Sequence, residues 1–419
     1  MIDIKHLVEN TETYAEELKI RGMNTGLAKE AKELYLDWKS VQQEVDGFRQ
    51  EQNKFNDTIL TLEGQAKIAG IIQMKEISTK LKNLESETRV LKEKLDEVVF
   101  KLPNPTWEGI PVGPDDSTNV VTAEFGERAK FDFTPKNYFD LPVFKRDYLG
   151  EKGVEAAGSR GYFIKGKLAK FQRVLFSYIL DKIENLGFDY IIPPIMVNDK
   201  VMYGTGFFPS SKNDFYSVNP GEDDLFLTGS SEPSLMFIES NNTLDLTTPR
   251  LLTANTSCFR REAGTYGKDT QGGIRVHQFE KIETVAICKP EESTKVFEML
   301  TDIFTQNMIS LGLNIHHLEV CSGDIGVKNY RQIDIEAWFP AQNTFRELCS
   351  SSNCTDYQTR NLNIKCKTID GEVKLAHSLN CTGVTNRAMF AIMEQNQQAD
   401  GRVKVPAVLV PLFGSEWME

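Results

Sequence analysis

Apolar residues recur every three or four positions through most of the first hundred residues of the chain. One series runs through residues 31–62 and a second through residues 74–102, each over several heptads. Two such seams are typical of helices that pack as a coiled coil. Residues 63–70 lie between them and contain two glycines that can reverse the chain. The pattern therefore predicts an antiparallel two-helix coiled coil with arms of roughly 45 Å.

The coiled-coil pattern ends at Leu102-Pro103-Asn104-Pro105, because proline cannot continue a helix. A loop containing Gly and Pro follows, so we expect one domain at residues 1–110 and a second at residues 111–419. From about residue 130, strand-like apolar runs alternate with helical patterns, which indicates a mixed α and β domain. An apolar face predicts a helix at residues 168–186. Strands are predicted at residues 188–192, 251–254, 277–287, 332–338 and 405–410.

Length and composition narrow the class of protein. The 419 residues suggest two or three domains, and 40% hydrophobic with 26% charged residues is ordinary for a soluble globular protein. The sequence has no apolar run of membrane-spanning length, and its N-terminus resembles neither a secretory signal nor a transit peptide, so we expect a cytoplasmic protein. Seven cysteines without a CxxC pair indicate free thiols. The net charge of -12 argues against a protein that coats nucleic acid non-specifically. It does not exclude an RNA enzyme, because a local basic strip can bind an RNA backbone while the rest of the surface stays acidic.

The most informative stretch joins two charged clusters through a Gly-rich connection. It runs from Cys258-Phe259-Arg260-Arg261-Glu262-Ala263-Gly264 to Gly273-Ile274-Arg275-Val276-His277-Gln278-Phe279-Glu280-Lys281-Ile282-Glu283. On antiparallel strands the two ends would face each other. Arginine suits phosphate because its planar fork binds two oxygens, phenylalanine can stack on a purine, and a carboxylate can hold an ammonium group or a metal. The stretch therefore offers possible partners for a phosphate, for a purine, and for an ammonium group or a metal.

Two further clusters contain residues that could bind a nucleotide or its metal ion. Glu347 and Ser350 lie three residues apart in a run that follows Asp334-Ile335-Glu336-Ala337-Trp338, and both are oxygen ligands suited to nucleotide-bound Mg²⁺. Arg387 opens a helix after a polar turn that contains glycine, where the electropositive helix start suits a triphosphate. A single cluster of this kind is more often a surface ion pair or a helix cap than a functional site. Three of them in order within one domain favour an active site.

Together the clusters resemble motifs 2 and 3 of class II aminoacyl-tRNA synthetases, and most closely the seryl family. FRREAG…GGIRVHQFEKIE is similar to motif 2 of that family, and LNCTGVTNRAMFAIMEQNQ is similar to its motif 3. DIEAWFPAQNTFRELCSSSNCTDYQ resembles its central strand and loop, and GFDYIIPPIMVNDKVMYGTG resembles motif 1. The resemblance covers nearly the whole chain. It implies an α+β fold, with an antiparallel-sheet catalytic domain following an N-terminal coiled coil.

The resemblance also implies roles for individual residues. Arg260 would bind the α-phosphate of ATP and the adenylate, while Arg275 and Arg387 would hold the outer phosphates. Phe279 would stack on adenine, and Glu262 would recognise the adenine amino group. Mg²⁺ would be held by Glu347 and Ser350. The serine site would consist of Ser230, Glu232, Arg260, Glu283, Asn380 and Thr382, with Glu283 taking the ammonium group.

The implied activity is serine activation with ATP followed by transfer of the seryl group to tRNA(Ser), and also to tRNA(Sec). The serine carboxylate would attack the α-phosphorus without a general base, and catalysis would come from positioning and charge neutralisation, chiefly by Arg260 and Arg387. The hairpin would grip the tRNA by shape, and motif 1 would form a homodimer.

Three departures from the family pattern stand out, and one is Asn361, which follows Arg360 where a second basic residue is common. Ser230 occupies a position that is usually threonine, and the segment from Asn380 to Arg387 is one residue shorter than usual. Two rival functions remain open. A related enzyme could load an aminoacyl adenylate onto a carrier protein, although such relatives tend to lack the hairpin. A non-catalytic coiled-coil interaction protein on a synthetase fold would lose Arg260, Arg387 or Glu347, and all three are present.

Overall fold

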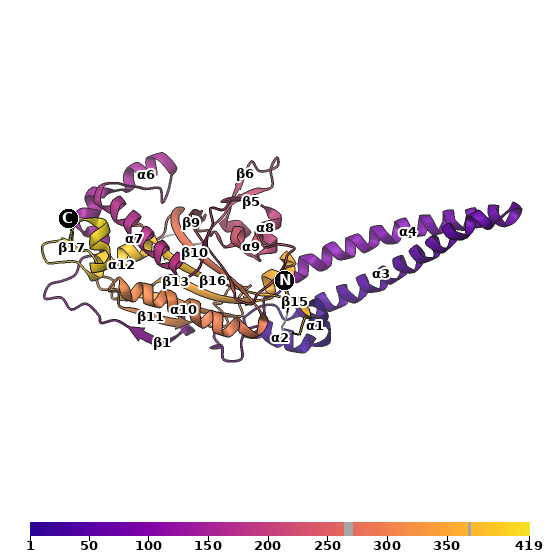
Figure 1. Ribbon diagram of the computed structural model, residues 1–419, viewed down its shortest axis with the longest axis horizontal. Helices are drawn as coiled ribbons and strands as arrows, with labels where there is room; N and C mark the ends of the chain where they lie inside the picture. Colours follow the sequence, from indigo (N-terminus) through magenta and orange to yellow (C-terminus); the bar gives the residue numbers. More distant parts are fainter. Residues whose placement is uncertain (264–270, 368–369) are drawn as a thin grey trace. The chain divides into compact units, whose positions relative to one another are not determined.

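The computed structural model describes residues 1–263, 271–367 and 370–419 and is shown in Figure 1. The chain divides into two compact units, Met1–Pro103 and Asn104–Glu419. The boundary expected near residue 110 lies a few residues beyond this division. Within the described residues, no helix is both long enough and apolar enough to cross a membrane.

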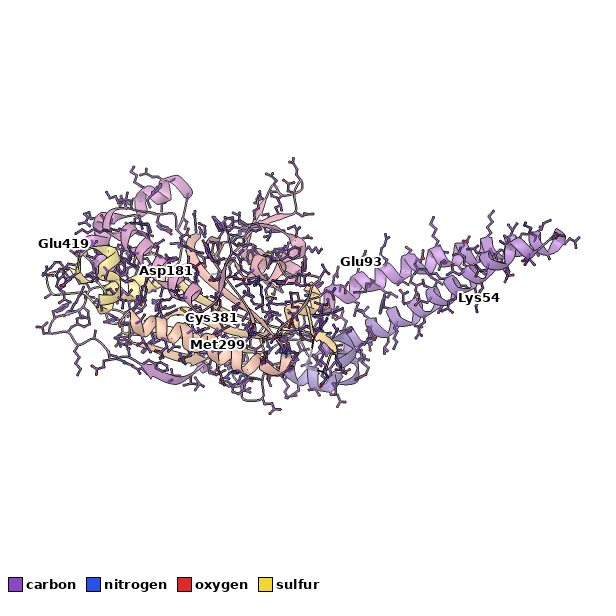
Figure 2. All side chains as sticks on the ribbon, in the orientation of Figure 1. Lys54, Glu93, Asp181, Met299, Cys381 and Glu419 are labelled. Atoms are coloured by element: carbon purple, nitrogen blue, oxygen red, sulfur yellow. The ribbon has the colours of Figure 1, made fainter. Side chains whose placement is uncertain are left out.

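The first unit is a helical hairpin preceded by two short helices. Helix α1 (Ile4–Glu9) and helix α2 (Thr11–Ile20) lead into α3 (Gly26–Thr58), and α3 packs against α4 (Gly64–Val99) (Figure 1). Arg49 Nη2 on α3 donates to Glu85 Oε1 on α4 at 2.7 Å. Charged side chains such as Lys54 and Glu93 lie on the exposed surface, away from the seam (Figure 2).

The chain reverses earlier than the glycine pair suggested. The 3₁₀ turn Ile59–Thr61 is followed by only two residues before α4 begins at Gly64, which has a φ of +53°. Gly70 lies inside α4, where an added Cβ would be 2.5 Å from a ring carbon of Phe55. Gly70 therefore permits close approach of the two helices, and it is Gly64 that serves the reversal.

An eight-stranded sheet forms the centre of the second unit. Its order is β1-β11-β12-β13-β16-β10-β9-β4, and every neighbouring pair is antiparallel except β4 with β9. In that order the strands are Val120–Phe125, Ile315–Glu319, Arg331–Phe339, Thr344–Thr355, His377–Thr385, Gln278–Cys288, Arg250–Phe259 and Asp189–Tyr190. The α+β composition predicted from the sequence is confirmed.

Three helices cover one face of this sheet. Helices α7 (Gly166–Asn185), α10 (Ser293–Ser310) and α12 (Asn386–Gln395) share one apolar core with alternate strand residues, among them Ile282 and Ile335. Because side chains alternate along a strand, the neighbours of these residues point to the opposite face. That opposite face carries Lys281, Glu283 and Asp334, and it is where the functional groups collect.

Smaller elements surround the sheet. The helices are α5 (Pro142–Asp147), α6 (Gly150–Ala157), α8 (Asp199–Gly204), α9 (Glu232–Phe237), α11 (Tyr357–Leu362) and α13 (Val410–Phe413). The short strands are β2 (Tyr148–Leu149), β3 (Phe163–Ile164), β5 (Met196–Asn198), β6 (Tyr216–Val218), β7 (Leu225–Leu227), β8 (Thr243–Leu244), β14 (Lys365–Lys367), β15 (Val373–Leu375), β17 (Val403–Lys404) and β18 (Trp417–Met418).

Most predicted elements of this unit are confirmed. The helix predicted at residues 168–186 is α7, and the strands predicted at 251–254 and 332–338 fall within β9 and β12. The strand predicted at 277–287 is β10, which begins one residue later, at Gln278. The strand predicted at 405–410 is wrong, because residues Ala407–Leu409 form a 3₁₀ helix and α13 follows. Pro406 and Pro411 explain the difference, since proline lacks the N–H that a strand ladder needs and is tolerated at a helix start.

Candidate active site

The ends of β9 and β10 bring the first charged clusters together. The strands are in register with Phe259 opposite Gln278 and Cys258 opposite Phe279. Beyond them the Arg260 N–H donates to the His277 carbonyl at 3.0 Å, and His277 Nδ1 lies 2.9 Å from the Arg260 carbonyl. The predicted facing of the two clusters is therefore confirmed. Gly264, at the end of the first cluster, lies outside the described residues.

A cleft on this face unites residues from all three sequence clusters. Its walls include six of the predicted site residues, which are Arg260, Glu262, Phe279, Glu347, Thr382 and Arg387. Lys281, Thr385 and Asn386 also line the cleft. The guanidinium carbon of Arg260 lies 5.5 Å from the centre of the Phe279 ring. A cation next to an exposed aromatic face is an arrangement suited to a nucleotide, whose phosphate and base need these two partners.

Glu262 is held by two arginines. Arg275 Nη1 donates to Glu262 Oε2 at 2.6 Å, and Arg160 Nη1 lies 3.9 Å from the same oxygen. The backbone of Glu262 has a φ of +52°, a conformation that costs energy for a residue with a side chain. Arg275, expected at the outer phosphates, lies in this ion pair and does not line the cleft beside Arg387.

Arg387 sits at the start of α12 and contacts Glu347. Its Nη1 donates to both the backbone carbonyl and Oε2 of Glu347, each at 3.0 Å. The N–H of Arg387 donates to Thr385 Oγ1 at 3.3 Å, which caps the helix. Removal from water alone would raise the pKa of Glu347, but the charges of Arg387 and Arg260 outweigh it and the pKa is lowered. An ionised carboxylate therefore faces the cleft.

A β-bulge places Glu347 and Ser350 on the same face of the sheet. Residues three apart on a regular strand point to opposite faces. Here Glu336 pairs with Glu347 and Asp334 pairs with Ser350, so Leu348 is an extra residue in β13. Glu347 and Ser350 consequently lie on the same face as Asp334. The Ser350 hydroxyl is hydrogen-bonded to Asp334, whose pKa is raised to about 8 by loss of solvent and then by the charge of Glu347.

The predicted serine-site residues surround a second, more enclosed group of charges. Glu232 is 4% exposed and Glu283 is 1% exposed, so neither carboxylate is solvated by bulk water. Glu232 Oε1 accepts from Gln358 Nε2 at 2.7 Å and from Asn380 Nδ2 at 3.2 Å, and it also pairs with Lys328.

Glu283 has its own partners. It forms an ion pair with Lys281, and Thr382 Oγ1 lies 3.5 Å from its Oε2. Burial raises the pKa of Glu283, the Lys281 charge opposes this, and the Glu232 charge adds to it. Lys281 Nζ donates to Ser230 Oγ at 3.4 Å, and the backbone N–H of Glu232 donates to the same hydroxyl at 3.3 Å.

The sequence analysis assigned no role to three members of this group, Lys281, Lys328 and Gln358. Lys281 could have been found, because it lies two residues before Glu283 on one strand and therefore on the same face. Gln358 ends the segment that resembles the central strand and loop of the family but had no predicted role, and Lys328 belongs to a segment that shows no motif. Only the folded chain brings the two residues to Glu232.

Comparisons with known proteins find matches for both parts of the chain. Residues 1–106 match the family model for the seryl-tRNA synthetase N-terminal domain, and residues 215–396 match the tRNA synthetase class II core domain (G, H, P, S and T). A serine–tRNA ligase of Campylobacter jejuni is 35% identical over 415 residues, which are 99% of this chain and 100% of that protein. A serine–tRNA ligase of Aliarcobacter butzleri is 38% identical over 413 residues, 98% and 99% of the two chains. Seryl-tRNA synthetase from Pyrococcus horikoshii, solved in complex with ATP, has a TM-score of 0.91 and 32% identity, covering 100% of this chain and 99% of that one.

Proposed function

The chain belongs to the seryl-tRNA synthetase family of class II enzymes, and from this premise we propose that it activates serine with ATP and transfers the seryl group to tRNA. One observation carries the proposal at the level of the site. A buried pair of carboxylates, Glu232 and Glu283, adjoins a cleft lined by Arg260 and Arg387. Such a site offers partners for an amino acid on one side and for a triphosphate on the other.

Serine is held in the enclosed part of the site. Glu283 accepts the ammonium group, and Ser230, Glu232, Asn380 and Thr382 surround the side chain. Because the polar groups are buried, a substrate without the hydroxyl would leave at least one of them unpaired, at a cost of about 1–3 kcal/mol. Hydrogen-bonding sites of this kind reject smaller analogues more strongly than apolar sites do.

ATP lies in the cleft. Phe279 stacks on the adenine, Glu262 accepts from its amino group, and Arg275 holds Glu262 in place. Arg260 binds the α-phosphate, and Arg387 neutralises the outer phosphates. The serine carboxylate attacks the α-phosphorus in line, a new oxygen–phosphorus bond forms, and pyrophosphate leaves with the electrons of the broken bond. A carboxylate is already nucleophilic, so positioning and charge stabilisation supply the catalysis.

Glu347 and Ser350 would hold Mg²⁺ together with the phosphates. No set of three or more His, Cys, Asp or Glu side chains among the described residues is placed to hold a metal ion. Mg²⁺ suits such a site, because it is commonly held by one or two protein oxygens together with phosphates and water. Bound there, the ion would neutralise phosphate charge, while Arg387 holds Glu347 in place.

The hairpin supports recognition of the tRNA. Near its reversal α4 exposes Ile68, Ile71 and Ile72, which is unusual for neighbouring large apolar side chains on a helix in water. With the lysines of the hairpin, such as Lys54 and Lys67, they offer a mixed apolar and basic surface for the folded RNA.

In the second step a 3′-terminal ribose hydroxyl of the tRNA attacks the seryl carbonyl and AMP leaves. We extend the proposal to tRNA(Ser) and tRNA(Sec) in the cytoplasm.

A homodimer is proposed through motif 1. The segment after α7 exposes Leu186, Tyr190, Ile192 and Met196, with Ile192 86% exposed. An exposed apolar patch of this kind is suited to the twofold interface of a homodimer. Ile192→Asp should shift the protein toward monomer in light scattering, while an unchanged mass would argue against this surface.

Serine-dependent exchange of pyrophosphate into ATP tests the central proposal. The purified protein, with Mg²⁺, should catalyse exchange with serine and not with alanine, threonine or cysteine. Serylation of tRNA in a second assay would separate a tRNA ligase from an enzyme that loads a carrier protein. If the folded protein shows no exchange with any amino acid, the proposal of an enzyme fails and a non-catalytic interaction protein takes its place.

A further inference from the structure

Lys328 reaches the serine site from outside every sequence motif. It lies in the connection between β11 and β12, and its side chain is only 15% exposed. Its ammonium group pairs with Glu232 and lies 4.5 Å from the centre of the Phe207 ring. Asn104 Nδ2 donates to the Lys328 carbonyl at 3.1 Å, so the backbone at this point is also fixed.

Three donors converge on a single oxygen of Glu232. Lys328 Nζ, Gln358 Nε2 and Asn380 Nδ2 all donate to Oε1. The amide of Gln358 cannot turn away, because its Oε1 accepts from Ser378 Oγ at 2.8 Å and its Nε2 also donates to the Thr205 carbonyl at 2.9 Å. The convergence fixes the carboxylate and leaves Oε2 as the oxygen available to a ligand.

Lys328 also balances the charge of the site. Two carboxylates this deeply buried repel each other, and each is costly without a cation. Lys281 forms an ion pair with Glu283, and Lys328 forms an ion pair with Glu232. Glu232 Oε2 can accept a hydrogen bond from the serine hydroxyl, whereas the alanine methyl group has no hydrogen to donate.

We propose that Lys328 is a specificity-determining residue of the serine site, which acts by holding the Glu232 carboxylate with Oε2 turned toward the substrate hydroxyl. It is a positioning residue and takes no part in the bond-making step. The inference rests on the proposed function, since it assigns a role within the same site.

Lys328→Met is the central test, because methionine keeps much of the side-chain length and removes the charge. Pyrophosphate exchange should show a serine KM raised about tenfold and a serine-to-alanine preference in kcat/KM reduced about tenfold, the ratio that corresponds to 1.4 kcal/mol. The KM for ATP should stay within about twofold of wild type, because Lys328 does not line the ATP cleft. Lys328→Arg should restore most of the serine-to-alanine preference.

Two controls separate this role from a general effect on folding. Lys145→Met removes another ion-paired lysine of the same unit, with Asp140 at 2.9 Å, and should leave both KM values unchanged. Glu232→Gln removes the group through which Lys328 acts, so adding Lys328→Met to it should cause no further loss of preference. If Lys328→Met does not fold, Lys328→Gln removes the same charge and carries the same test.

The outcomes distinguish this inference from the proposed function. If wild type exchanges with serine while the charge-removing variant keeps its serine KM and its preference over alanine, the inference is wrong and the function stands. If the variant loses preference equally in the Glu232→Gln background, Lys328 does not act through Glu232. If wild type itself does not exchange, the proposed function fails first.

Discussion

Raising the pH should weaken the folded protein through Asp334, and Asp334→Asn should remove that effect. Loss of solvent and the nearby charge of Glu347 raise the pKa of Asp334 from 3.8 to about 8. Between those two values the folded chain holds a proton that the unfolded chain has released. Stability is therefore present at low pH and is lost as the pH rises toward the folded-state pKa.

The change in unfolding free energy with pH follows from the single proton that the folded chain holds on Asp334. Stability should fall by about 1.4 kcal/mol for each pH unit, or about 3 kcal/mol between pH 5.5 and pH 7.5. Burial also raises the pKa of Glu283 and Glu394, so the wild-type slope contains their contributions. The quantity to compare is thus the difference between wild type and Asp334→Asn.

Urea denaturation of the ligand-free protein at both pH values measures this difference. Asp334→Asn should gain stability relative to wild type as the pH rises. Asp400→Asn is a suitable control, because the hydrogen bonds from Arg402 lower the pKa of that carboxyl and it is ionised over the whole interval. Equal pH dependence in wild type and Asp334→Asn would refute the assignment of the proton to Asp334.

Three further predictions test other parts of the chain. Gly383→Ala would place a Cβ 2.8 Å from Ile282 Cγ2, and overpacking of this kind should cost about 1–3 kcal/mol in urea denaturation, so an unchanged unfolding free energy would contradict it. Arg387→Ala should lower the kcat of pyrophosphate exchange roughly 10²–10³-fold, and Arg387→Lys should recover only part, whereas a wild-type rate in Arg387→Ala would remove this arginine from the mechanism. Ile71→Asp should reduce tRNA serylation about tenfold or more with pyrophosphate exchange unchanged, and equal loss in both assays would show that the hairpin does not act through tRNA.

Much of the architecture could be predicted because its signals are local. The heptad pattern requires only that two helices hide their apolar seams, and the apolar face of α7 follows the same reasoning. The class II fold, predicted from the resemblance, is confirmed by the antiparallel sheet and by the family matches. The strand predicted at residues 405–410 failed because apolar residues alone cannot show that Pro406 and Pro411 interrupt a ladder.

The composition of the serine site was less accessible to sequence reasoning. Glu283 and Lys281 are neighbours on one strand, so strand periodicity joins them. Gln358 and Lys328 contribute to the same carboxylate from α11 and from a loop 30 residues earlier in the chain. Nothing in the residues around Lys328 distinguishes it from a solvated surface lysine. Its role depends on the carboxylate that folding brings to it.

Two β-bulges explain how the site departs from simple strand periodicity. Leu348 is the extra residue in β13, and Gly383 is the extra residue in β16, since Ile282 pairs with Val384 while Glu283 pairs with Thr382. Because of each bulge, two residues that are three apart in the sequence lie on the same face of the sheet. One brings Glu347 beside Ser350, and the other leaves Thr382 and Thr385 together on the cleft side.

The bulge at Gly383 also bears on the shortened segment from Asn380 to Arg387. Regular pairing through this segment would turn either Thr382 or Thr385 toward the helix-covered face. With the extra residue, Thr382 stays opposite Glu283, and Thr385 still caps α12 ahead of Arg387. A side chain at position 383 would meet Ile282, so glycine is what allows the bulge to form there. The short segment therefore still allows contacts in both parts of the site. Asn380 donates to Glu232 in the serine site, and Arg387 donates to Glu347 in the ATP cleft.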